Sequence, residues 1–383
     1  MNIFNQEQAR CWAEIDLAAL ERNLFKIRSA LPGHIRYVAV VKADAYGHGL
    51  AQTAARLMQS GADMFAVANV REAVAIREMG SGWPILVLSA VLPHEDAYLF
   101  QHNLIPTIST LEEIRRLDDK ARAGNTTLNV HLKIDTGMGR LGAWHEQAEP
   151  VIEGLGNATA LKLTGIFTHF SSAPTDGDFT SLQRNRFLAV LEQVAKFHEL
   201  EACLIHADNS ASLRSFDQSN PFNAVRVGLL QFGAAPYPDS LFANVSTEPV
   251  LSFHSRVSLV KPLPQGTPIS YGRLLTLQRL SHIAVLAAGY ADGIPMKFTN
   301  RGQVLIKGSR CPVLGRVTMD QLIVDVTDLP RLPQSGDVAT FIGKRGGKEI
   351  TVAEFSKWAE TIPWECFCSI SQRVPRIYKT FRE

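Results

Sequence analysis

The chain has 383 residues, of which 46% are hydrophobic and 20% charged, and its 39 basic and 37 acidic residues give a net charge of +2. This composition excludes a disordered chain, and the balanced charge argues against nucleic acid or a membrane surface as a partner. The length favours one large domain followed by a smaller one.

The five cysteines are odd in number and form no C-x-x-C pair, which favours a reducing compartment over a disulfide framework. Residues 1–12 show no basic start followed by an apolar core, so we expect no secretory signal. No apolar run reaches the roughly 18 residues of a membrane span. These features together predict a cytoplasmic protein.

Apolar runs alternate with amphipathic stretches from Arg36 to about Gly233. The runs predict eight strands, at residues 36–41, 63–68, 83–90, 104–109, 126–135, 161–170, 202–210 and 223–228. The stretches between them predict helices, at residues 49–61, 70–80, after 90, at 110–124 and after 178. Residues 110–124 begin with a capping box, in which Thr110 is the N-cap and Glu113 follows three residues later. This alternation predicts an α/β fold with a parallel sheet.

A closed (β/α)8 TIM-type barrel over residues 13–237 suits the strand count better than an open sheet, and its active site would lie at the carboxyl ends of the strands. No G-x-G-x-x-G follows the first strand, so we expect no nucleotide site, and we expect no metal site either. Short β-type runs broken by Gly and Pro predict a mostly-β C-terminal domain over residues 238–383, with residues 351–360 as its only clear helix. The sequence also predicts a strand near the start of the chain, which could join either domain. If it joins the second domain, residues 1–16 would pack there.

Polar residues gather at the predicted strand ends. They are Lys42, Lys133, Asp135, Arg140, His169, Asn209, Ser210, Arg226 and Gly228. The last two strand ends of such barrels commonly bind phosphate through backbone amides and small hydroxyls, which suits Ser210 and Gly228. Ser210 is explained equally well as the N-cap of a helix over residues 210–216.

Lys42 ends a strand of four apolar residues and has two interpretations. A lysine at a strand end extends its ammonium group into water. In a partly desolvated site, however, burial favours the neutral amine, which forms a Schiff base with an aldehyde. Lysine and a phosphate site in one barrel mouth predict pyridoxal phosphate or a sugar-phosphate carbonyl as the ligand.

Nine short motifs distinguish this chain from other barrel proteins. They are "AVVKADAYGHG", "KIDTGMGRLG", "THF", "HADNSAS", "VRVG", "ISYG", "AAGYADG", "GRVTMDQ" and "CSISQRVPRIY". In order and approximate spacing, from about Ala13 to Tyr378, the chain resembles the bacterial alanine racemases. The resemblance implies a barrel that carries pyridoxal phosphate, a β-domain, and a head-to-tail homodimer with shared active sites. It also implies interconversion of L- and D-alanine, which supplies D-alanine for peptidoglycan.

The resemblance assigns a role to most residues at the strand ends. Lys42 would hold the cofactor covalently. The other cofactor-binding residues would be Tyr46, His169, Asn209, Ser210, Arg226, Gly228 and Leu229. Arg226 would face the pyridine nitrogen and leave it unprotonated, because an arginine keeps its proton. Arg140 would bind the substrate carboxylate, and Lys133 matches a position that is often carbamylated in the family, where it would orient Arg140.

Racemisation needs a proton to leave one face of the substrate and return to the other, so two bases serve it best. The resemblance implies that these are Lys42 and Tyr271 of the partner subunit, with the amide of Met319 binding the carboxylate across the interface. The pocket and its entrance would include Trp364, Tyr290, Asp320 and Arg316. Three of the assigned residues also have simpler explanations when taken alone. Tyr271 could be a turn residue, Met319 a packing residue, and His169 a core histidine.

Five positions depart from the family pattern. Trp364 and Phe167 stand where the family commonly has tyrosine. Pro174 replaces an acid, Met296 an arginine, and Thr318 a cysteine. A bulky Trp364 favours alanine, and serine or another small amino acid is the alternative substrate. A related barrel decarboxylase would need groups that labilise the carboxylate in place of Arg140. A non-catalytic barrel that carries pyridoxal phosphate would lack the β-domain with Tyr271.

Overall fold

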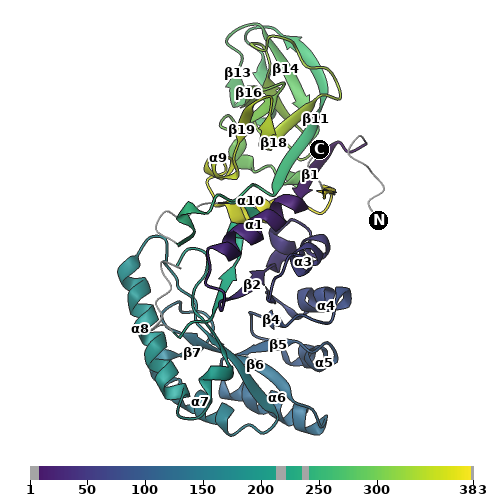
Figure 1. Cartoon of the computed structure of the whole chain (residues 1–383). Helices are drawn as coiled ribbons and strands as arrows, with labels where there is room; N and C mark the ends of the chain where they lie inside the picture. Colours follow the sequence, from purple (N-terminus) through teal and green to yellow (C-terminus); the bar gives the residue numbers. More distant parts are fainter. Residues whose placement is uncertain (1–7, 213–220, 235–240, 381–383) are drawn as a thin grey trace.

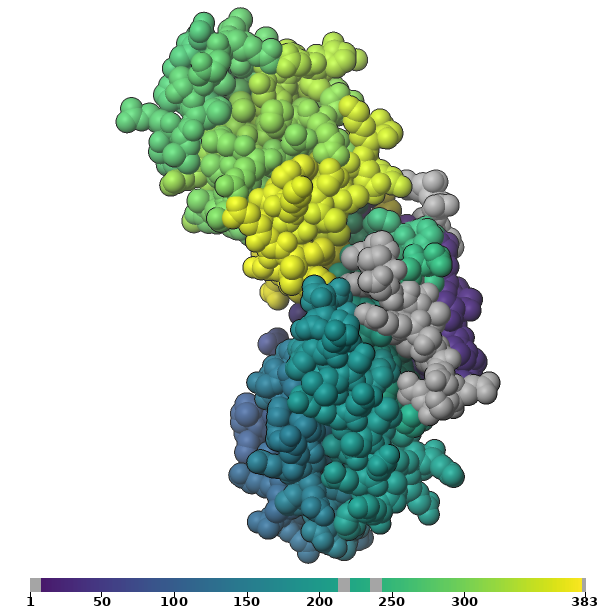
Figure 2. All heavy atoms as spheres, turned by 90° about the vertical axis from the view of Figure 1, so that its left-hand side faces the viewer, coloured from purple at the N-terminus to yellow at the C-terminus, as the bar shows by residue number. Residues whose placement is uncertain are grey.

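The computed structural model describes residues 8–212, 221–234 and 241–380. They form two lobes joined end to end, with the last part of the chain, in yellow, between the lobes (Figures 1 and 2). The predicted boundary between residues 237 and 238 lies outside the described residues, so the division at that point stays a prediction. None of the helices in the described part combines the length and apolarity needed to cross a membrane.

The larger lobe is a parallel barrel. Its eight described strands run in the order β10-β2-β3-β4-β5-β6-β8-β9. Their bounds are β2 (Arg36–Val40), β3 (Met64–Val67), β4 (Ile85–Val87), β5 (Ile105–Ile108), β6 (Leu128–Asp135), β8 (Leu161–Phe167), β9 (Leu204–His206) and β10 (Ala224–Val227). A parallel bridge between Asn209 and Arg226 brings β9 and β10 together, so the circle nearly closes. The predicted barrel and its eight strands are confirmed.

Helices cover the outside of the barrel (Figure 1). They are α1 (Leu17–Ser29), α3 (Leu50–Gln59), α4 (Val70–Met79), α5 (Asp96–Gln101), α6 (Leu111–Ala123), α7 (Glu149–Gly156) and α8 (Gly177–Val194), and the two-residue β7 (Ala143–Trp144) pairs with β6. The predicted capping box is present on α6, where Thr110 Oγ1 accepts from the Glu113 amide and Glu113 Oε2 accepts from the Thr110 amide. The barrel strands are buried on both faces, which is why they are near-continuous apolar runs.

The smaller lobe is built on a mostly antiparallel sheet in the order β19-β18-β15-β16-β17-β14-β11-β1-β20. Its elements are β1 (Cys11–Asp16), β11 (Leu251–Leu263), β12 (Pro268–Ile269), β13 (Leu275–Thr276), β14 (Ser281–Leu286), β15 (Gln303–Ile306), β16 (Ser309–Leu314), β17 (Leu322–Asp325), β18 (Val338–Arg345), β19 (Lys348–Ile350), α9 (Val352–Trp358), α10 (Pro363–Ser369) and β20 (Arg376–Lys379). The strand near the start, β1, joins this sheet by pairing with β11 and β20.

Helix α10 corrects the prediction that α9 would be the only clear helix of this lobe. Pro363 occupies the first turn of α10, where its missing N–H costs no hydrogen bond and its fixed φ suits a helix start. Helix α10 packs directly on the turn that follows β2. A Cβ on Gly47 would lie 2.3 Å from the Phe367 carbonyl oxygen. The second lobe therefore touches the strand end that carries Lys42.

Candidate active site

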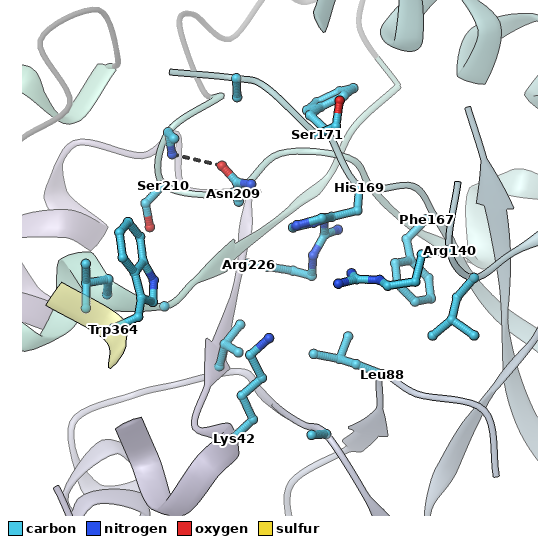
Figure 3. Close-up of a pocket in the computed structure, with 18 of the residues that line it drawn as sticks. Lys42, Leu88, Arg140, Phe167, His169, Ser171, Asn209, Ser210, Arg226 and Trp364 are labelled. Carbon is cyan, nitrogen blue, oxygen red and sulfur yellow. Dashed lines mark hydrogen bonds between the residues drawn. The ribbon is translucent and has the colours of Figure 1, made fainter. Parts of the chain in front are cut away.

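A cavity of about 660 Å³ opens at the carboxyl ends of the barrel strands. Most of the predicted site residues line it: Lys42, Tyr46, Lys133, Arg140, Phe167, His169, Pro174, Asn209, Ser210, Arg226, Gly228, Leu229 and Trp364. Figure 3 shows Lys42, Arg140, His169 and Arg226 pointing toward the same space, with Ser210 and Trp364 at the other side. The structure thus brings together residues that are far apart in the sequence.

Lys42 begins the segment labelled α2 (Lys42–Tyr46), a turn of unusual hand. Residues 43–46 all have φ between 53° and 54°, so the backbone makes one left-handed helical turn. For residues other than glycine this conformation costs roughly 1–2 kcal/mol each, and it persists only where the surroundings enforce it. The left hand of this turn, which also carries Tyr46, is a finding of the structure.

Contacts from several elements hold this left-handed turn. Glu72 Oε1 accepts from the Ala43 amide at 2.7 Å, and Asp44 Oδ1 accepts from the Leu50 amide at 2.7 Å. From the second lobe, Arg376 Nε donates to the Gly47 carbonyl at 3.0 Å. Strain stored at a site and balanced from outside it is typical of a preorganised functional segment. These hydrogen bonds therefore fix the backbone from which the Lys42 side chain enters the cavity.

The environment of Lys42 destabilises its charged form. Burial lowers the pKa of Lys42, and the positive charges of Arg140 and Arg226 lower it further. A lysine that simply extends into water would show no such shift. The geometry supports the second interpretation of Lys42, a nucleophilic amine at a strand end.

Arg226 on β10 is buried, and its two Nη groups are fully engaged. Nη1 donates to Nδ1 and to the carbonyl of His206, both at 2.8 Å, and Nη2 donates to the carbonyls of Thr168 and Ala207 at 2.8 and 2.9 Å. Among the described residues, Nε–H is the guanidinium hydrogen that finds no acceptor. Burial lowers the pKa of Arg226 to about 10, so it remains a cation at neutral pH.

The bond to Arg226 determines the tautomer of two buried histidines. Arginine can only donate, so His206 Nδ1 accepts and its Nε2 carries the hydrogen, which is donated to His131 Nδ1 at 3.1 Å. Burial lowers the pKa of His131 to about 3 and that of His206 well below its usual value, so both rings are neutral. We missed both residues in the sequence, although a histidine inside an apolar strand is itself a signal.

His169 also lies beside Arg226, with its Nδ1 3.4 Å from Arg226 Nη2. Burial, followed by the charge of Arg226, lowers the pKa of His169 to about 2. A neutral His169 that accepts at Nδ1 carries its hydrogen on Nε2. His169 therefore supplies a hydrogen-bond donor, and the positive charge of this region comes from the arginines.

Arg140 is carried by a loop that one carboxylate organises. Asp135 Oδ1 accepts from the amides of residues 137, 138 and 139 at 2.8–3.2 Å, and Oδ2 accepts from the Arg140 amide at 2.8 Å. These hydrogen bonds lower the pKa of Asp135 against the opposing effect of burial. Gly142 closes the loop where φ is 118° and a Cβ would lie 2.6 Å from the Asp135 amide nitrogen. Asp135 thus fixes the position from which Arg140 enters the cavity.

Lys133 lies next to this loop with its Nζ 4.3 Å above the ring of Phe167. Burial lowers the pKa of Lys133 well below its usual value, and the nearby cations Arg226 and Arg140 add to this effect. A neutral amine of this kind is reactive toward electrophiles. The rings of Phe167 and His206 also stack, with their centroids 4.8 Å apart, so Phe167 contacts both Lys133 and His206.

The opposite end of the cavity has the chemistry of a phosphate site. Ser210 Oγ is buried and has no hydrogen-bond partner in the described part of the chain. A Cβ on Gly228 would lie 2.8 Å from the Tyr46 hydroxyl, so only glycine leaves this cradle open. Asn209 Oδ1 accepts from the amides of residues 211 and 212 and so shapes the turn that carries Ser210. Residues 213–216 of the helix predicted to start at Ser210 lie outside the described residues.

The remaining predicted residues form a separate hollow of about 790 Å³ on the β-domain. Tyr271, Tyr290, Met296, Arg316, Thr318, Met319 and Asp320 all line it, and it shares no residue with the first cavity. Tyr271 is 70% exposed and Met319 52% exposed. Within one chain, the structure does not bring Tyr271 together with Lys42.

The first cavity fits a phosphorylated aldehyde cofactor. An amine with a lowered pKa lies at one end, an unpartnered buried hydroxyl and an open glycine cradle lie at the other, and an arginine with a spare N–H lines the space between. With the barrel, these features define the class of (β/α)8 enzymes that hold pyridoxal phosphate through a lysine.

Comparison with known proteins narrows this class to one family. Residues 15–236 match the model of the alanine racemase N-terminal domain, and residues 250–378 match that of the alanine racemase C-terminal domain. The alanine racemase of Halothermothrix orenii is 39% identical over 369 residues, which cover 96% of each chain. The chain belongs to the alanine racemase family.

Solved structures agree with this assignment. An alanine racemase from Clostridium difficile superposes with a TM-score of 0.90 at 31% identity, covering 97% of this chain and 96% of that one. The alanine racemase from Bartonella henselae, determined with covalently bound pyridoxal phosphate, superposes with a TM-score of 0.87 at 26% identity, covering 97% of this chain and all of that one.

Proposed function

We propose that this protein interconverts L- and D-alanine with pyridoxal phosphate bound through Lys42, and that it supplies D-alanine for peptidoglycan in the cytoplasm. The observation that carries the proposal is the joint presence, in one cavity, of a lysine with a lowered pKa, a phosphate cradle and Arg226. The five cysteines are unpaired, which suits a reducing compartment.

The residues around the cavity would hold the cofactor at both ends. Lys42 would bind its aldehyde carbon, while the Ser210 hydroxyl, the Tyr46 hydroxyl and the amides of Gly228 and Leu229 would bind its phosphate. The spare Nε–H of Arg226 would donate to the ring nitrogen. When bound, the cofactor's conjugated ring accepts the electron pair left when the Cα–H bond of the amino acid breaks.

Arg226 would limit the chemistry of a bound cofactor. A cation whose pKa is about 10 donates and does not transfer its proton at neutral pH, so Arg226 would leave the ring nitrogen of the cofactor unprotonated. By keeping its proton, Arg226 would favour return of the substrate proton to Cα over side reactions such as transamination.

Two bases would move the proton. Lys42 would act on one face of the substrate, and Tyr271 of the partner subunit would act on the other. His169 would donate through its Nε2–H to the Tyr271 oxygen and so link that base to Arg226. Arg140 would bind the substrate carboxylate, together with the backbone amide of Met319 of the partner subunit.

The separation of the two cavities supports a head-to-tail homodimer. Lys42 lies in the barrel mouth, whereas Tyr271 and Met319 lie exposed on a different lobe. Two copies that place the β-domain hollow of each over the barrel cavity of the other would complete two sites in a closed C2 arrangement. A single chain would then be inactive.

Lys133 would be carbamylated in this site. Its neutral amine is a nucleophile toward carbon dioxide, and the resulting carbamate would be an anion beside Arg140. The change would add a negative charge beside Arg140 and form an ion pair that orients Arg140. Mass spectrometry of crosslinked or rapidly quenched enzyme would detect the added carboxyl group.

Incubation with L-alanine in D2O tests the function. The proposal predicts loss of optical rotation with uptake of one deuterium at Cα, and borohydride reduction that fixes the cofactor on Lys42. Release of carbon dioxide would instead show a decarboxylase. Faster turnover of L-serine than of L-alanine would move the substrate assignment to serine, and a colourless protein without reducible cofactor would exclude the proposal.

A further inference from the structure

Gln183 lies on α8, outside the cavity wall, yet it connects two of the segments that build the site. Its side chain is fully buried. Its amide contacts the loop that follows β6, at Thr136, and the segment that follows β8, at His169 and Ser171. No motif in the sequence pointed to this residue.

The amide of Gln183 uses its whole hydrogen-bonding capacity. Oε1 accepts from the Ser171 amide at 3.0 Å and from the Ser171 hydroxyl at 3.3 Å. Nε2 donates to Thr136 Oγ1 at 3.4 Å and to the His169 carbonyl at 3.3 Å. A primary amide has two lone pairs and two hydrogens to offer, so this one is satisfied completely.

The orientation of the amide follows from the backbone groups it meets. The Ser171 N–H can only donate, which places Oε1 beside it, and the His169 carbonyl can only accept, which places Nε2 beside it. A flipped amide would lose both bonds in a buried setting, where each unpaired group is costly. The side chain therefore has one orientation, and the spacing of its two partners is correspondingly fixed.

Each arm of Gln183 reaches a segment with a role in the site. Thr136 directly follows Asp135 and begins the loop that carries Arg140, and Arg186 of the same helix also donates to the Thr136 carbonyl at 3.0 Å. His169 is the residue beside Arg226. The two segments also meet through Thr136 Oγ1 and Thr168 Oγ1, which are 2.8 Å apart.

An ordinary core position of α8 would not need an amide. The other fully or nearly buried positions further along the helix are apolar: Phe187, Val190, Leu191 and Val194. A buried amide contributes rigidity only when its network is complete, as it is here. The difference sets Gln183 apart from the packing residues of its helix.

We propose that Gln183 is a positioning residue that fixes the distance between the Arg140 loop and the His169–Ser171 segment. Its consequence for catalysis rests on the proposed function, because that function assigns the substrate carboxylate to Arg140. The structural part of the inference, that one amide holds two cavity walls together, stands on the contacts alone.

The test compares the Gln183→Met and Val190→Ala holoenzymes with the wild type. Methionine keeps the length of the side chain but removes all four hydrogen bonds, and Val190→Ala loosens the same helix without touching the cavity. We expect Gln183→Met to speed amide hydrogen exchange in peptides covering residues 136–141 and 169–173 about tenfold. We also expect it to weaken binding of propionate, followed by cofactor fluorescence, about tenfold and to raise KM for L-alanine more than it lowers kcat.

A second pair of variants isolates one arm. Thr136→Val removes the hydroxyl that both Gln183 Nε2 and Thr168 Oγ1 contact, whereas Thr168→Val removes only the contact between the two threonines. Exchange in residues 136–141 should therefore rise more in Thr136→Val than in Thr168→Val, while the Ser171 amide stays protected in both. This comparison decides the question if Gln183→Met does not fold, because equal exchange in the two threonine variants would overturn the arm at Thr136.

Two results would overturn the proposal: unchanged exchange and propionate affinity in Gln183→Met, or equal changes in Val190→Ala. If the wild type fails to racemise alanine while Gln183→Met still speeds exchange at both segments, the proposed function is wrong and the positioning role is supported.

Discussion

Arg226 Nη1 lies 2.8 Å from His206 Nδ1, and this contact fixes which atom of each neighbouring histidine carries a hydrogen. The two hydrogen bonds have one direction: Arg226 Nη1 donates to His206 Nδ1, and His206 Nε2 donates to His131 Nδ1. The guanidinium is thereby anchored through its Nη groups, and its Nε–H has no acceptor among the described residues. A neutral histidine pair inside the barrel holds the cation that faces the cofactor site.

Removing the hydrogen-bond acceptor at residue 206 should lower racemase activity more than replacing His206 with a shorter residue that still accepts. In His206→Phe, Arg226 loses an acceptor in a buried setting, at a cost of about 1–3 kcal/mol. In His206→Asn, Oδ1 takes approximately the place of Nδ1, so the anchor is kept. We expect His206→Phe to lower kcat/KM at least about tenfold below His206→Asn, as measured by racemisation of L-alanine.

Buried neutral histidines should make the protein sensitive to acid. The pKa of His131 is about 3 in the folded protein, against about 6.5 when exposed in the unfolded chain. Between these values the unfolded state binds more protons, so the free energy of unfolding falls as pH falls from about 6.5. His48, whose pKa burial lowers to about 4, acts in the same direction.

The variant His131→Asn isolates one of these groups, because Oδ1 can still accept from His206 while the titrating ring is gone. At about pH 8 the variant should be less stable than the wild type, since the smaller side chain leaves a cavity. Toward about pH 5 the difference in thermal unfolding midpoint between the two holoenzymes should shrink. A difference that stays constant or grows would show that His131 is protonated in the folded protein.

The Asp135 carboxylate should control how well Arg140 binds substrate. In Asp135→Asn an amide NH2 group takes the place of Oδ2. Because this group donates and cannot accept, the hydrogen bond from the Arg140 amide is lost. We expect KM for L-alanine to rise about tenfold while the fold is kept. Asp119→Asn, on the exposed face of α6, serves as the control and should leave KM unchanged. Equal KM values for the two variants would show that Asp135 does not control substrate binding by Arg140.

Trp364 should limit the size of the substrate side chain, because its ring borders the cavity beside Ser210 (Figure 3). Trp364→Ala opens that wall, and we expect the ratio of kcat/KM for L-serine to that for L-alanine to increase about tenfold. Trp144→Ala, at an exposed tryptophan, is the control. An unchanged ratio would place the side chain of the substrate elsewhere in the cavity.

Much of the fold could be predicted because its signals are local. The eight barrel strands are short apolar runs that alternate with amphipathic stretches, and a parallel barrel brings all their carboxyl ends to one face. Lys42, Arg140, His169 and Arg226 were predicted at strand ends for that reason, and the structure gathers them around one cavity.

Other features depend on distant contacts and could not be predicted. The left-handed turn after Lys42 is enforced by Glu72 and by Arg376 from the other lobe, while its own residues have no preference for that hand. Gln183 looks like one more polar residue of a helix until the fold places two strand ends beside it. Within one chain Tyr271 and Lys42 line separate cavities, and no local pattern in the sequence predicts that separation.

The proposal that two chains share each active site is tested most directly by the racemase activity of mixed dimers. If each site combines Lys42 of one chain with Tyr271 of the other, Lys42→Ala and Tyr271→Phe each disable every site of their own homodimer, whereas a mixed dimer has one intact site. Co-expression of the two variants should restore about a quarter of the wild-type activity, because half of the dimers are mixed and each has one working site of two. Co-expression of Tyr271→Phe with a chain that carries both substitutions should restore none. Activity no higher than that of the two variants assayed separately would contradict a site built from Lys42 and the Tyr271 of a second copy.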